Sequence, residues 1–488
     1  MKPNNLIILM ADQLRFDVLG KGFTPHIDSL AKESVVFDRT YTQCPLCVPA
    51  RGAFFTGLCP NANGSLINPW EKRDARYGDV RKGIDNLYLM VERAGWCSIH
   101  TGKQHLYTQG GKLEDRAESP TFFASTEKSY KEFLKANDRR MPGGPRFRTY
   151  VPEMVGGKTT KIARYSTPET GRYEEGEPYY FDSYFTKTGI EALRKRNKTK
   201  PLFLSVMFLA PHPPLDVPDP WYSRVRNEDF SLPENVGKFY PGQSVLQMYN
   251  LPGIVGSHYR RSEWQETWRV YLGLVSMLDK LVGDVIDELR RQDAYDDSII
   301  VFTSDHGEML GSHALFQKMC MYEESVHVPL SIKFPKAMHQ KHQHIHQIVS
   351  HIDVLPTLVE LTGLHHEGPL EGASLMSTIK SGDKDEKRTS YIQYDGNGSR
   401  SNFQRAIVHG SYKLIVDMFK DELFYELYDV VKDPEETTNL IFNKDYDEVA
   451  HSLFDDLADH MRKSGDLLAV PGWNLMKFRS DREDLLVP

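Results

Sequence analysis

The stretch Leu6-Ile-Ile-Leu-Met10-Ala-Asp12-Gln13 decides the fold class. Its five leading apolar residues have the length of a strand, and a strand without polar alternation is expected to be buried on both faces, as in a parallel sheet. In open α/β sheets, ligands collect beyond the carboxyl ends of the strands, so Asp12 and Gln13 are candidate ligand-binding residues. Taken alone, however, this run is better explained with Asp12 as a helix N-cap.

The same arrangement recurs along the chain, because three further apolar runs end in polar residues. The runs at 96–100, 201–210 and 298–303 lead to Lys103 and His105, to His212, and to Asp305 and His306, with Lys318 further on. Each of these has an ordinary explanation, such as a solvated lysine or a turn histidine. Their joint placement at strand ends is an improbable coincidence. Together they offer ligands for a divalent cation, positive charge for an oxyanion, and histidines for proton transfer.

Helical patterns separate the apolar runs, which predicts an α/β fold with a mostly parallel central sheet flanked by helices. A charged segment at 383–388 marks the expected boundary between an N-terminal catalytic domain (1–382) and a smaller C-terminal α+β subdomain (383–488). In the latter, strands between 391 and 416 and a helix at 449–461 indicate an antiparallel sheet with a covering helix. From 107 to 183 the periodicity fails, which is typical of a long surface insertion that shapes a substrate pocket.

Composition excludes several classes of partner. The chain has 488 residues and a formal net charge of −7, which argues against nucleic acid and anionic membranes. No apolar run reaches membrane-spanning length, and five cysteines do not form a disulfide framework. The N-terminus has no signal-peptide pattern, so we expect a cytoplasmic protein, or a periplasmic or secreted one if a leader was removed. The oligomeric state is left open.

A second stretch, Cys44-Pro-Leu-Cys47-Val-Pro-Ala-Arg51-Gly-Ala-Phe-Phe-Thr56-Gly57, carries candidate chemistry. A cysteine just ahead of a predicted helix lies at the positive end of the peptide dipoles, and Arg51 adds a fixed cation. This place suits an activated nucleophile or an anionic substrate, although a cysteine before a helix is more often plain packing. A redox role for the Cys44-X-X-Cys47 pair is disfavoured because no thioredoxin-like βαβ context surrounds it.

The Cys47-X-Pro-X-Arg51 spacing resembles the maturation signature of the type I, formylglycine-dependent sulfatases of the alkaline phosphatase superfamily. Further matches follow in family order: Asp305-His-Gly-Glu, Lys318 followed by Tyr322-Glu-Glu, Val328-Pro-Leu330, and Leu427-Tyr-Asp-Val-Val-Lys-Asp-Pro-Glu435. The resemblance covers nearly the whole chain. It implies an alkaline-phosphatase-like fold, hydrolysis of a sulfate ester, and a maturation enzyme that oxidises Cys47 to formylglycine (3-oxoalanine), whose hydrate attacks sulfur.

The resemblance also assigns roles at the matching positions. It implies that Asp12, Gln13, Asp305 and His306 bind the metal, that Arg51 and His105 hold and deprotonate the formylglycine hydrate, that Lys103 and Lys318 bind the sulfate, and that His212 protonates the leaving alcohol. The metal of the family is usually Ca²⁺. Gln13 and His306 make this site softer and less anionic than Ca²⁺ prefers, so Mg²⁺ and Mn²⁺ stay open. His313 follows closely and either contacts substrate or packs.

Three functions are therefore compared. The favoured one is a sulfatase acting on a sulfated carbohydrate, such as a saccharide derived from a glycosaminoglycan. The alternatives are a phosphonate monoester or phosphodiester hydrolase of the same superfamily, and a non-catalytic binder of sulfated glycans. The pair Lys103 and His105 favours the sulfatase because it resembles that family's sulfate-binding residues.

Overall fold

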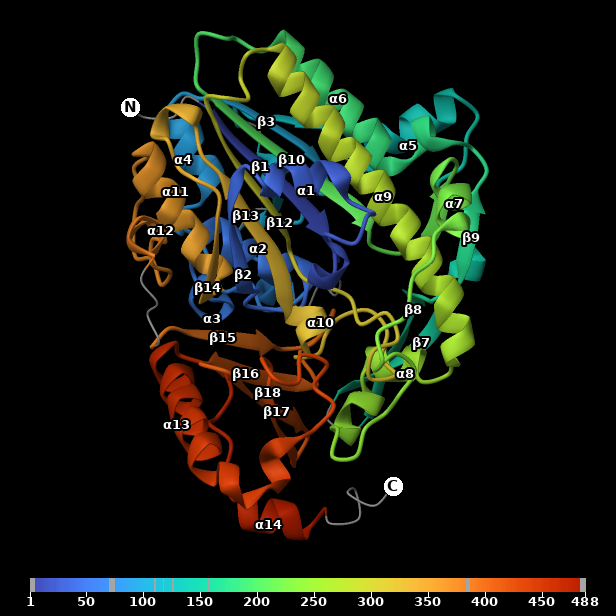
Figure 1. Cartoon of the computed structure of the whole chain (residues 1–488), viewed down its shortest axis with the longest axis vertical. Helices are drawn as coiled ribbons and strands as arrows, with labels where there is room; N and C mark the ends of the chain where they lie inside the picture. Colours follow the sequence, from blue (N-terminus) through green and yellow to red (C-terminus); the bar gives the residue numbers. More distant parts are fainter. Residues whose placement is uncertain are drawn as a thin grey trace.

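The computed structural model describes residues 5–69, 75–108, 111–116, 118–124, 127–155, 158–382 and 387–482. Its centre is an eight-stranded sheet in the order β14-β2-β13-β12-β1-β10-β3-β6 (Figure 1). These strands are β1 (Asn5–Asp12), β2 (Ser34–Tyr41), β3 (Cys97–Gly102), β6 (Phe122–Ala124), β10 (Leu202–Pro211), β12 (Ser298–Ser304), β13 (His327–Lys333) and β14 (Gln343–Ser350).

The central sheet is mostly parallel, as predicted. Strand β1 pairs in parallel with β10 and with β12, and β3 is parallel to β10 and β6. Strand β13 is antiparallel to both of its neighbours, β12 and β2. Because the pairs around β1 are parallel, the carboxyl ends of β1, β3, β10 and β12 meet at one edge of the sheet.

Alternate residues of β1 pack into two cores, one on each face of the sheet. Ile7 and Leu9 belong to a core shared with α1 (Pro25–Ala31), α6 (Phe181–Lys195) and α9 (Arg261–Arg291). Leu6, Ile8 and Met10 belong to the other core, which is shared with α2 (Cys47–Thr56), α4 (Leu87–Arg93), α11 (Val354–Thr362) and α12 (Met376–Ser381). This two-sided burial explains why the strand has no polar alternation.

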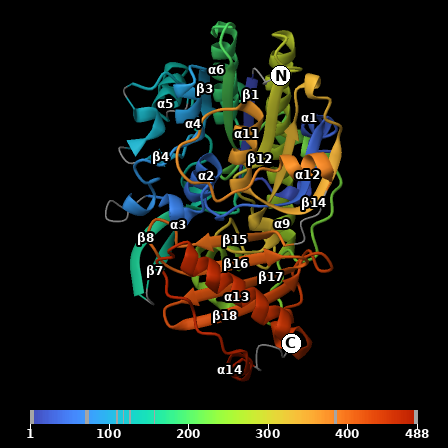
Figure 2. The same cartoon turned by 90° about the vertical axis from the view of Figure 1, so that its left-hand side faces the viewer.

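A second sheet lies beside the first and is antiparallel throughout. It consists of β15 (Thr389–Tyr394), β16 (Phe403–His409), β17 (Tyr412–Phe419) and β18 (Glu422–Asp429) in sequence order. Helix α13 (Asp447–Lys463) lies across it, and α14 (Leu475–Ser480) follows near the C-terminus (Figure 2). The predicted domain boundary at 382/383 adjoins 383–386, which lie outside the described residues.

The segment at 107–183 is more ordered than we expected from its sequence. It contains β4 (Tyr107–Thr108), β5 (Gly111–Lys112), α5 (Glu127–Ala136), the paired strands β7 (Arg148–Val155) and β8 (Lys158–Ser166), and β9 (Thr170–Tyr173), which pairs with β11 (Leu215–Pro218). The β7–β8 ribbon leaves large apolar side chains exposed, namely Tyr150 (68%) and Ile162 (64%). These exposed residues alternate with Val151 (2%) and Tyr165 (6%), which pack into the core, so the period-two pattern covers only a few positions of the ribbon.

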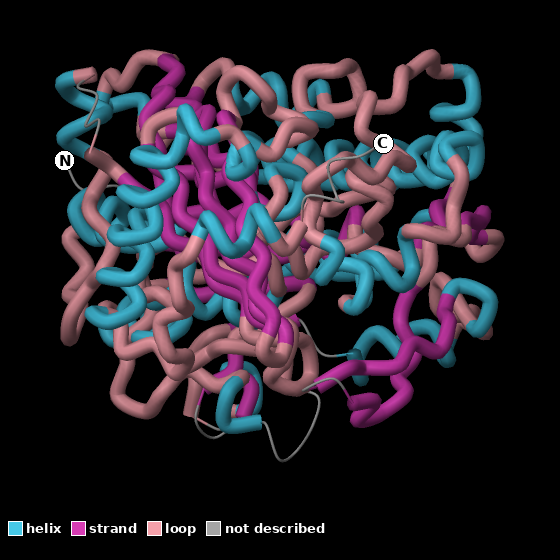
Figure 3. Tube along the Cα trace, turned by 90° about the horizontal axis from the view of Figure 1, so that it is seen from below, coloured by secondary structure: helices cyan, strands magenta, loops and turns pink. Residues whose placement is uncertain are grey.

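Figure 3 looks along the molecule from below, with strands running through the middle and helices to either side. Across the described residues, no helix combines the length and the apolar character that a membrane crossing requires.

Candidate active site

The site begins where β1 ends and α2 starts. Asp12 is the last residue of β1, and Cys47 is the first residue of α2, preceded by Leu46 as the N-cap. Asp12 is 0% and Cys47 2% exposed, and the Cys47 Sγ lies 3.8 Å from Asp12 Oδ1. The thiol therefore occupies the N-terminus of a ten-residue helix, where the peptide dipoles favour negative charge.

Arg51, one turn further along α2, joins the ends of two strands. Its Nη2 lies 2.8 Å from Asp12 Oδ2, and its Nε lies 2.9 Å from Asp305 Oδ2. Its Nη1 donates to the backbone carbonyl of Lys103. Since all three charged side chains in these ion pairs are 0% exposed, Arg51 fixes the relative positions of the two carboxylates without contact with water.

Lys103 directly follows β3, and its side chain extends toward Asp12 and Cys47. Its Nζ lies 2.6 Å from Asp12 Oδ2 and 3.7 Å from Cys47 Sγ. The backbone conformation that directs Lys103 toward Asp12 requires glycine at residue 102. Gly102 has φ +91°, and a Cβ at this position would lie 2.0 Å from the carbonyl oxygen of Met207. A side chain at residue 102 would thus displace β10 or move Lys103 out of the site.

Asp305 and His306 follow β12 and complete the group of side chains around Cys47, which is called the centre below. His306 Nδ1 lies 3.0 Å from the Gly307 carbonyl oxygen, while Nε2 lies 3.2 Å from Cys47 Sγ. A proton on Nδ1 satisfies that carbonyl and leaves the Nε2 lone pair facing the centre, which is the arrangement of a metal-binding histidine. Asp305 Oδ1 accepts hydrogen bonds from the backbone N–H groups of Gln13 and His306, at 3.2 and 2.9 Å.

Gln13 and Lys318 lie together behind this centre. Lys318 Nζ donates to Gln13 Oε1 at 2.5 Å, and Gln13 Nε2 donates to Glu308. Gln13 has a left-handed backbone (φ +69°), which turns its side chain toward the β12–β13 loop. Glu308, which also accepts from the backbone N–H groups of Leu310 and Gln317, has no counterpart in the sequence-based assignment.

The surrounding cations determine the charge states of the centre. Burial and Asp12 act to raise the pKa of the Cys47 thiol, but the positive charges nearby, chiefly those of Lys103 and Lys318, outweigh them and lower it. The pKa of Asp12 lies well below its usual value, because the neighbouring cations overcome the effect of burial. The centre therefore holds an ionised carboxylate and favours negative charge at position 47.

Two histidines at the edge of this centre are held neutral. Burial lowers the pKa of His105 well below its usual range, and Lys103 and Arg51 add to the effect. The Nδ1 of His105 is buried without a hydrogen-bond partner among the described residues. Burial, Lys318 and Lys103 likewise lower the pKa of His212, whose Nδ1 lies 2.6 Å from the Pro213 carbonyl oxygen.

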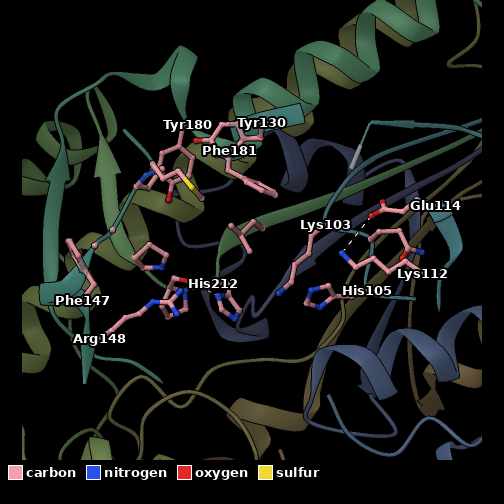
Figure 4. A pocket seen from close by; sticks show the side chains of 18 of the residues that line it. Lys103, His105, Lys112, Glu114, Tyr130, Phe147, Arg148, Tyr180, Phe181 and His212 are labelled. Atoms are coloured by element: carbon pink, nitrogen blue, oxygen red, sulfur yellow. Dashed lines mark hydrogen bonds and ion pairs between the residues drawn. The ribbon is translucent and has the colours of Figure 1, made fainter. Parts of the chain in front are cut away.

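A cavity of about 430 Å³ opens beside these residues (Figure 4). Lys103, His105 and His212 line the part nearest the centre. The remaining walls come largely from the 107–183 segment, as expected, and include Tyr107, Lys112, Glu114, Tyr130, Met141, Phe147, Arg148, Tyr180 and Phe181. None of these wall residues was a candidate from the sequence; the only signal was the density of aromatic and charged residues in that segment.

His313 lies elsewhere. Its ring is 0% exposed and stacks on Tyr322 with 4.1 Å between the ring centroids. Its Nδ1 lies 3.2 Å from Gln243 Oε1, and it does not line the cavity. The position of His313 fits the packing alternative and not the predicted contact with substrate.

The remaining candidate residues converge. Ligand atoms of Asp12, Cys47, Asp305 and His306 lie within 4.8 Å of one another. Gln13 is joined to this group through its backbone N–H on Asp305, and Lys318 through Gln13. The structure thus brings together residues that are up to 306 positions apart in the sequence, since Asp12 and Lys318 both belong to one connected cluster.

Comparisons with known proteins agree with this arrangement. The sulfatase family profile matches residues 4–364, and the profile of the C-terminal part of N-sulphoglucosamine sulphohydrolase matches residues 311–463. An arylsulfatase of Clostridium perfringens is 26% identical, with 92% of each chain covered.

Solved structures share the fold. A phosphonate monoester hydrolase of Agrobacterium radiobacter superposes with a TM-score of 0.76 at 22% identity and covers 95% of this chain and 96% of its own. The protein BT4656, solved with its substrate D-glucosamine-2-N,6-O-disulfate, superposes with a TM-score of 0.71 at 21% identity and covers 96% and 99%. The chain belongs to the sulfatase family of the alkaline phosphatase superfamily and is a sulfuric ester hydrolase.

Proposed function

We propose that this enzyme removes sulfate from a sulfated saccharide, with a formylglycine made from Cys47 by a maturation enzyme and with a divalent cation. The observation that carries the proposal is the position of Cys47: a buried helix N-terminus, 3.2 Å from His306 Nε2 and 3.7 Å from Lys103 Nζ. When hydrated, formylglycine supplies a geminal diol in place of the thiol, and thus an oxygen nucleophile. The residues around Cys47 favour the anionic form that such a nucleophile requires.

The donor set fits a divalent cation. Asp12 and Asp305 each turn one carboxylate oxygen to Arg51, which leaves Oδ1 of each residue on the side of Cys47 and His306. Together with His306 Nε2, these atoms would hold the metal, and the Gln13 amide oxygen, which accepts from Lys318 Nζ in this structure, would join them by exchanging that hydrogen bond for the metal. The metal would supply charge neutralisation for a sulfate oxygen and for the nucleophile. We propose Ca²⁺, since three of the four donors are oxygens, with Mg²⁺ and Mn²⁺ as alternatives.

The cations of the site suit a sulfate ester. Lys103 and Lys318 would bind the sulfate oxygens, and Arg51 holds the carboxylates behind them. Both lysines are close enough to Cys47 and His212 to lower the pKa values of these two groups. Charge that develops on the sulfate oxygens during attack would meet these ammonium groups in a buried place, where the interaction is strongest.

The two histidines divide the proton transfers. His105 is neutral and has a buried Nδ1 without a partner among the described residues, so it can accept a proton from the nucleophile. His212 lines the cavity and can donate a proton to the leaving alcohol. Burial is the largest cause of the low pKa of His212, and Lys318 and Lys103 add to it; a sulfate between the lysines would offset their part and so favour the protonated imidazole.

The saccharide part of the proposal rests on the cavity. Its volume of about 430 Å³ exceeds the needs of a sulfate group alone, and its walls carry tyrosine, phenylalanine and charged side chains. The related fold of BT4656, whose structure was solved with a disulfated glucosamine as its substrate, supports a sulfated sugar for this chain as well.

Mass spectrometry of the tryptic peptide that ends at Arg51 tests the nucleophile. Protein co-produced with a formylglycine-generating enzyme should show an aldehyde in place of the Cys47 thiol. The same preparation should hydrolyse para-nitrophenyl sulfate faster than phenyl phosphonate monoesters. An unmodified thiol in an active preparation would refute the formylglycine, and a preference for phosphonate esters would favour the phosphonate monoester hydrolase instead.

A further inference from the structure

The charge on the cavity walls differs from the charge of the whole chain. The protein is acidic, with a net charge of −7, yet among the described residues the lining of the cavity holds Lys103, Lys112 and Arg148 against one carboxylate, Glu114. A cavity with this balance attracts a ligand of more than one negative charge. One sulfate ester contributes a single negative charge, and the lysines nearest Cys47, Lys103 and Lys318, are already proposed to bind it.

The three cations differ in how their charge is used. Lys103 is 2.6 Å from Asp12, and Lys112 is 3.7 Å from Glu114. The guanidinium of Arg148, by contrast, makes no hydrogen bond or ion pair with any residue in the described parts of the chain, and only the backbone of Arg148 is hydrogen-bonded. An arginine without a carboxylate partner at the wall of a cavity keeps its full capacity for a ligand anion.

Arg148 is also placed for a second group of the substrate. Figure 4 shows Phe147 and Arg148 on the opposite side of the cavity from Lys103 and His105, with His212 between them. A saccharide whose sulfate lies at Lys103 would reach Arg148 if it extended past His212. Because Arg148 lies on the other side of His212 from Lys103, it is placed for a second substituent and not for the reacting sulfate.

The backbone around Arg148 is fixed by its neighbours. Phe147 is 2% exposed, its N–H donates to Gly144 at 3.2 Å, and its carbonyl accepts from Thr167 at 3.0 Å. Arg148 then begins β7 and pairs with Ser166 of β8. The guanidinium thus extends from a positioned strand start, and a planar guanidinium binds carboxylate or sulfate oxygens in pairs.

We propose that Arg148 forms a second anion-binding site in this cavity, so that the preferred substrate is a saccharide with a further carboxylate or sulfate besides the sulfate that is removed. This inference rests on the proposed function for the identity of the reacting end. Lys112, which already faces Glu114, is a weaker contributor on the other wall.

Calorimetric titration tests the site without turnover. The Cys47→Ala background would be titrated with a disaccharide that carries a uronate carboxylate, an N-sulfate and an O-sulfate, alone and with Arg148→Ala added. We expect Arg148→Ala to raise the Kd about tenfold, as for the loss of a charge-assisted pair. Arg146→Ala is the matched control: Arg146 lies two residues away and bonds the Thr170 carbonyl, but it does not line the cavity, so its Kd should stay within twofold.

Two analogues identify the group that is recognised. If Arg148 binds the uronate carboxylate, the methyl ester of the disaccharide should bind the Cys47→Ala protein about tenfold more weakly than the free acid. Adding Arg148→Ala should then cause no further loss of affinity. If Arg148 binds the N-sulfate, the analogue with an N-acetyl group in its place should show this loss of affinity instead. An unchanged Kd in Arg148→Ala, an equal loss in Arg146→Ala, or failure of the disaccharide to bind would overturn the second site.

A kinetic measurement separates the second site from the proposed function. Arg148→Ala should keep its kcat/KM for para-nitrophenyl sulfate within twofold, because this ester has no second anion. Failure of the formylglycine mechanism would appear in the wild-type peptide mass and not in these titrations. A large loss on para-nitrophenyl sulfate would instead assign Arg148 to the structure of the cavity and refute its role as a specificity residue.

Discussion

Arg51 Nη2 lies 2.8 Å from Asp12 Oδ2, between two side chains that are both 0% exposed. This ion pair joins α2, whose first residue is Cys47, to the end of β1. The second ion pair of Arg51, with Asp305, adds the end of β12. A single guanidinium therefore holds the helix N-terminus against two strand ends, and its planar shape allows both pairs at once.

Removal of Arg51 should destabilise the protein strongly. Arg51→Ala leaves Asp12 and Asp305 as buried carboxylates without this cation, and breaking a buried pair costs about 3–5 kcal/mol. Urea unfolding at neutral pH measures the change. Arg93→Ala is the matched control, because Arg93 also pairs with an aspartate, Asp85, but is 38% exposed, which limits the expected loss to about 1 kcal/mol. Equal losses in the two variants would contradict the structural role of Arg51.

Replacement of Cys47 should abolish turnover and leave the fold intact. The side chain is small, and it contributes one thiol to a centre held by the ion pairs of Arg51. We expect Cys47→Ala to lose activity on para-nitrophenyl sulfate to the background level, with a circular dichroism spectrum like that of the wild type. Unaltered turnover in this variant would refute the formylglycine mechanism.

Metal binding should be detectable as a change in thermal stability. Ca²⁺ added to chelator-treated protein should raise the Tm, since a ligand that binds only the folded state stabilises it. Asp305→Asn should weaken this effect, because it removes charge from the donor set while keeping the shape. Mg²⁺ and Mn²⁺ titrations under the same conditions rank the ions. An identical Tm response in wild type and Asp305→Asn would remove Asp305 from the metal site.

The sequence predicts the reacting end of this site better than the rest of it. Asp12, Lys103 and Asp305 follow apolar runs whose burial on both faces made the strands recognisable, and parallel pairing brings their ends together. Arg148 and Phe147 could not be placed in this way. They line the cavity because of where the β7–β8 ribbon packs, and the short alternation around its buried residues Val151 and Tyr165 does not specify that position.

Stability between pH 8 and 10 should depend on Lys333, which lies in β13 far from the catalytic residues in the fold. Its Nζ donates to the Tyr295 carbonyl at 2.5 Å, and burial lowers its pKa from 10.5 to about 8. In this window the unfolded chain binds more protons at this residue than the folded one. The contribution of Lys333 to the free energy of unfolding therefore rises with pH from about 8 to 10.5.

The variant Lys333→Met removes this titration while keeping an unbranched side chain of similar length. Urea unfolding of wild type and variant at pH 7, 8, 9 and 10 should show the wild type gaining stability relative to the variant as the pH rises. Other groups titrate equally in both proteins and cancel in the difference. A constant difference over this range would mean that Lys333 is not the group whose pKa burial lowers.

The most specific prediction for the chemistry concerns His212. Alcohols with a high pKa leave slowly unless they are protonated, whereas para-nitrophenolate leaves without help. His212→Ala should therefore lower kcat on a sulfated sugar about a hundredfold, within the usual range for a general acid, and should lower kcat on para-nitrophenyl sulfate only a few-fold. The comparison within one variant removes errors from folding or maturation, since these scale both rates equally. Equal losses on the two esters would assign His212 to binding of the sulfate, together with Lys103 and Lys318, and not to proton donation.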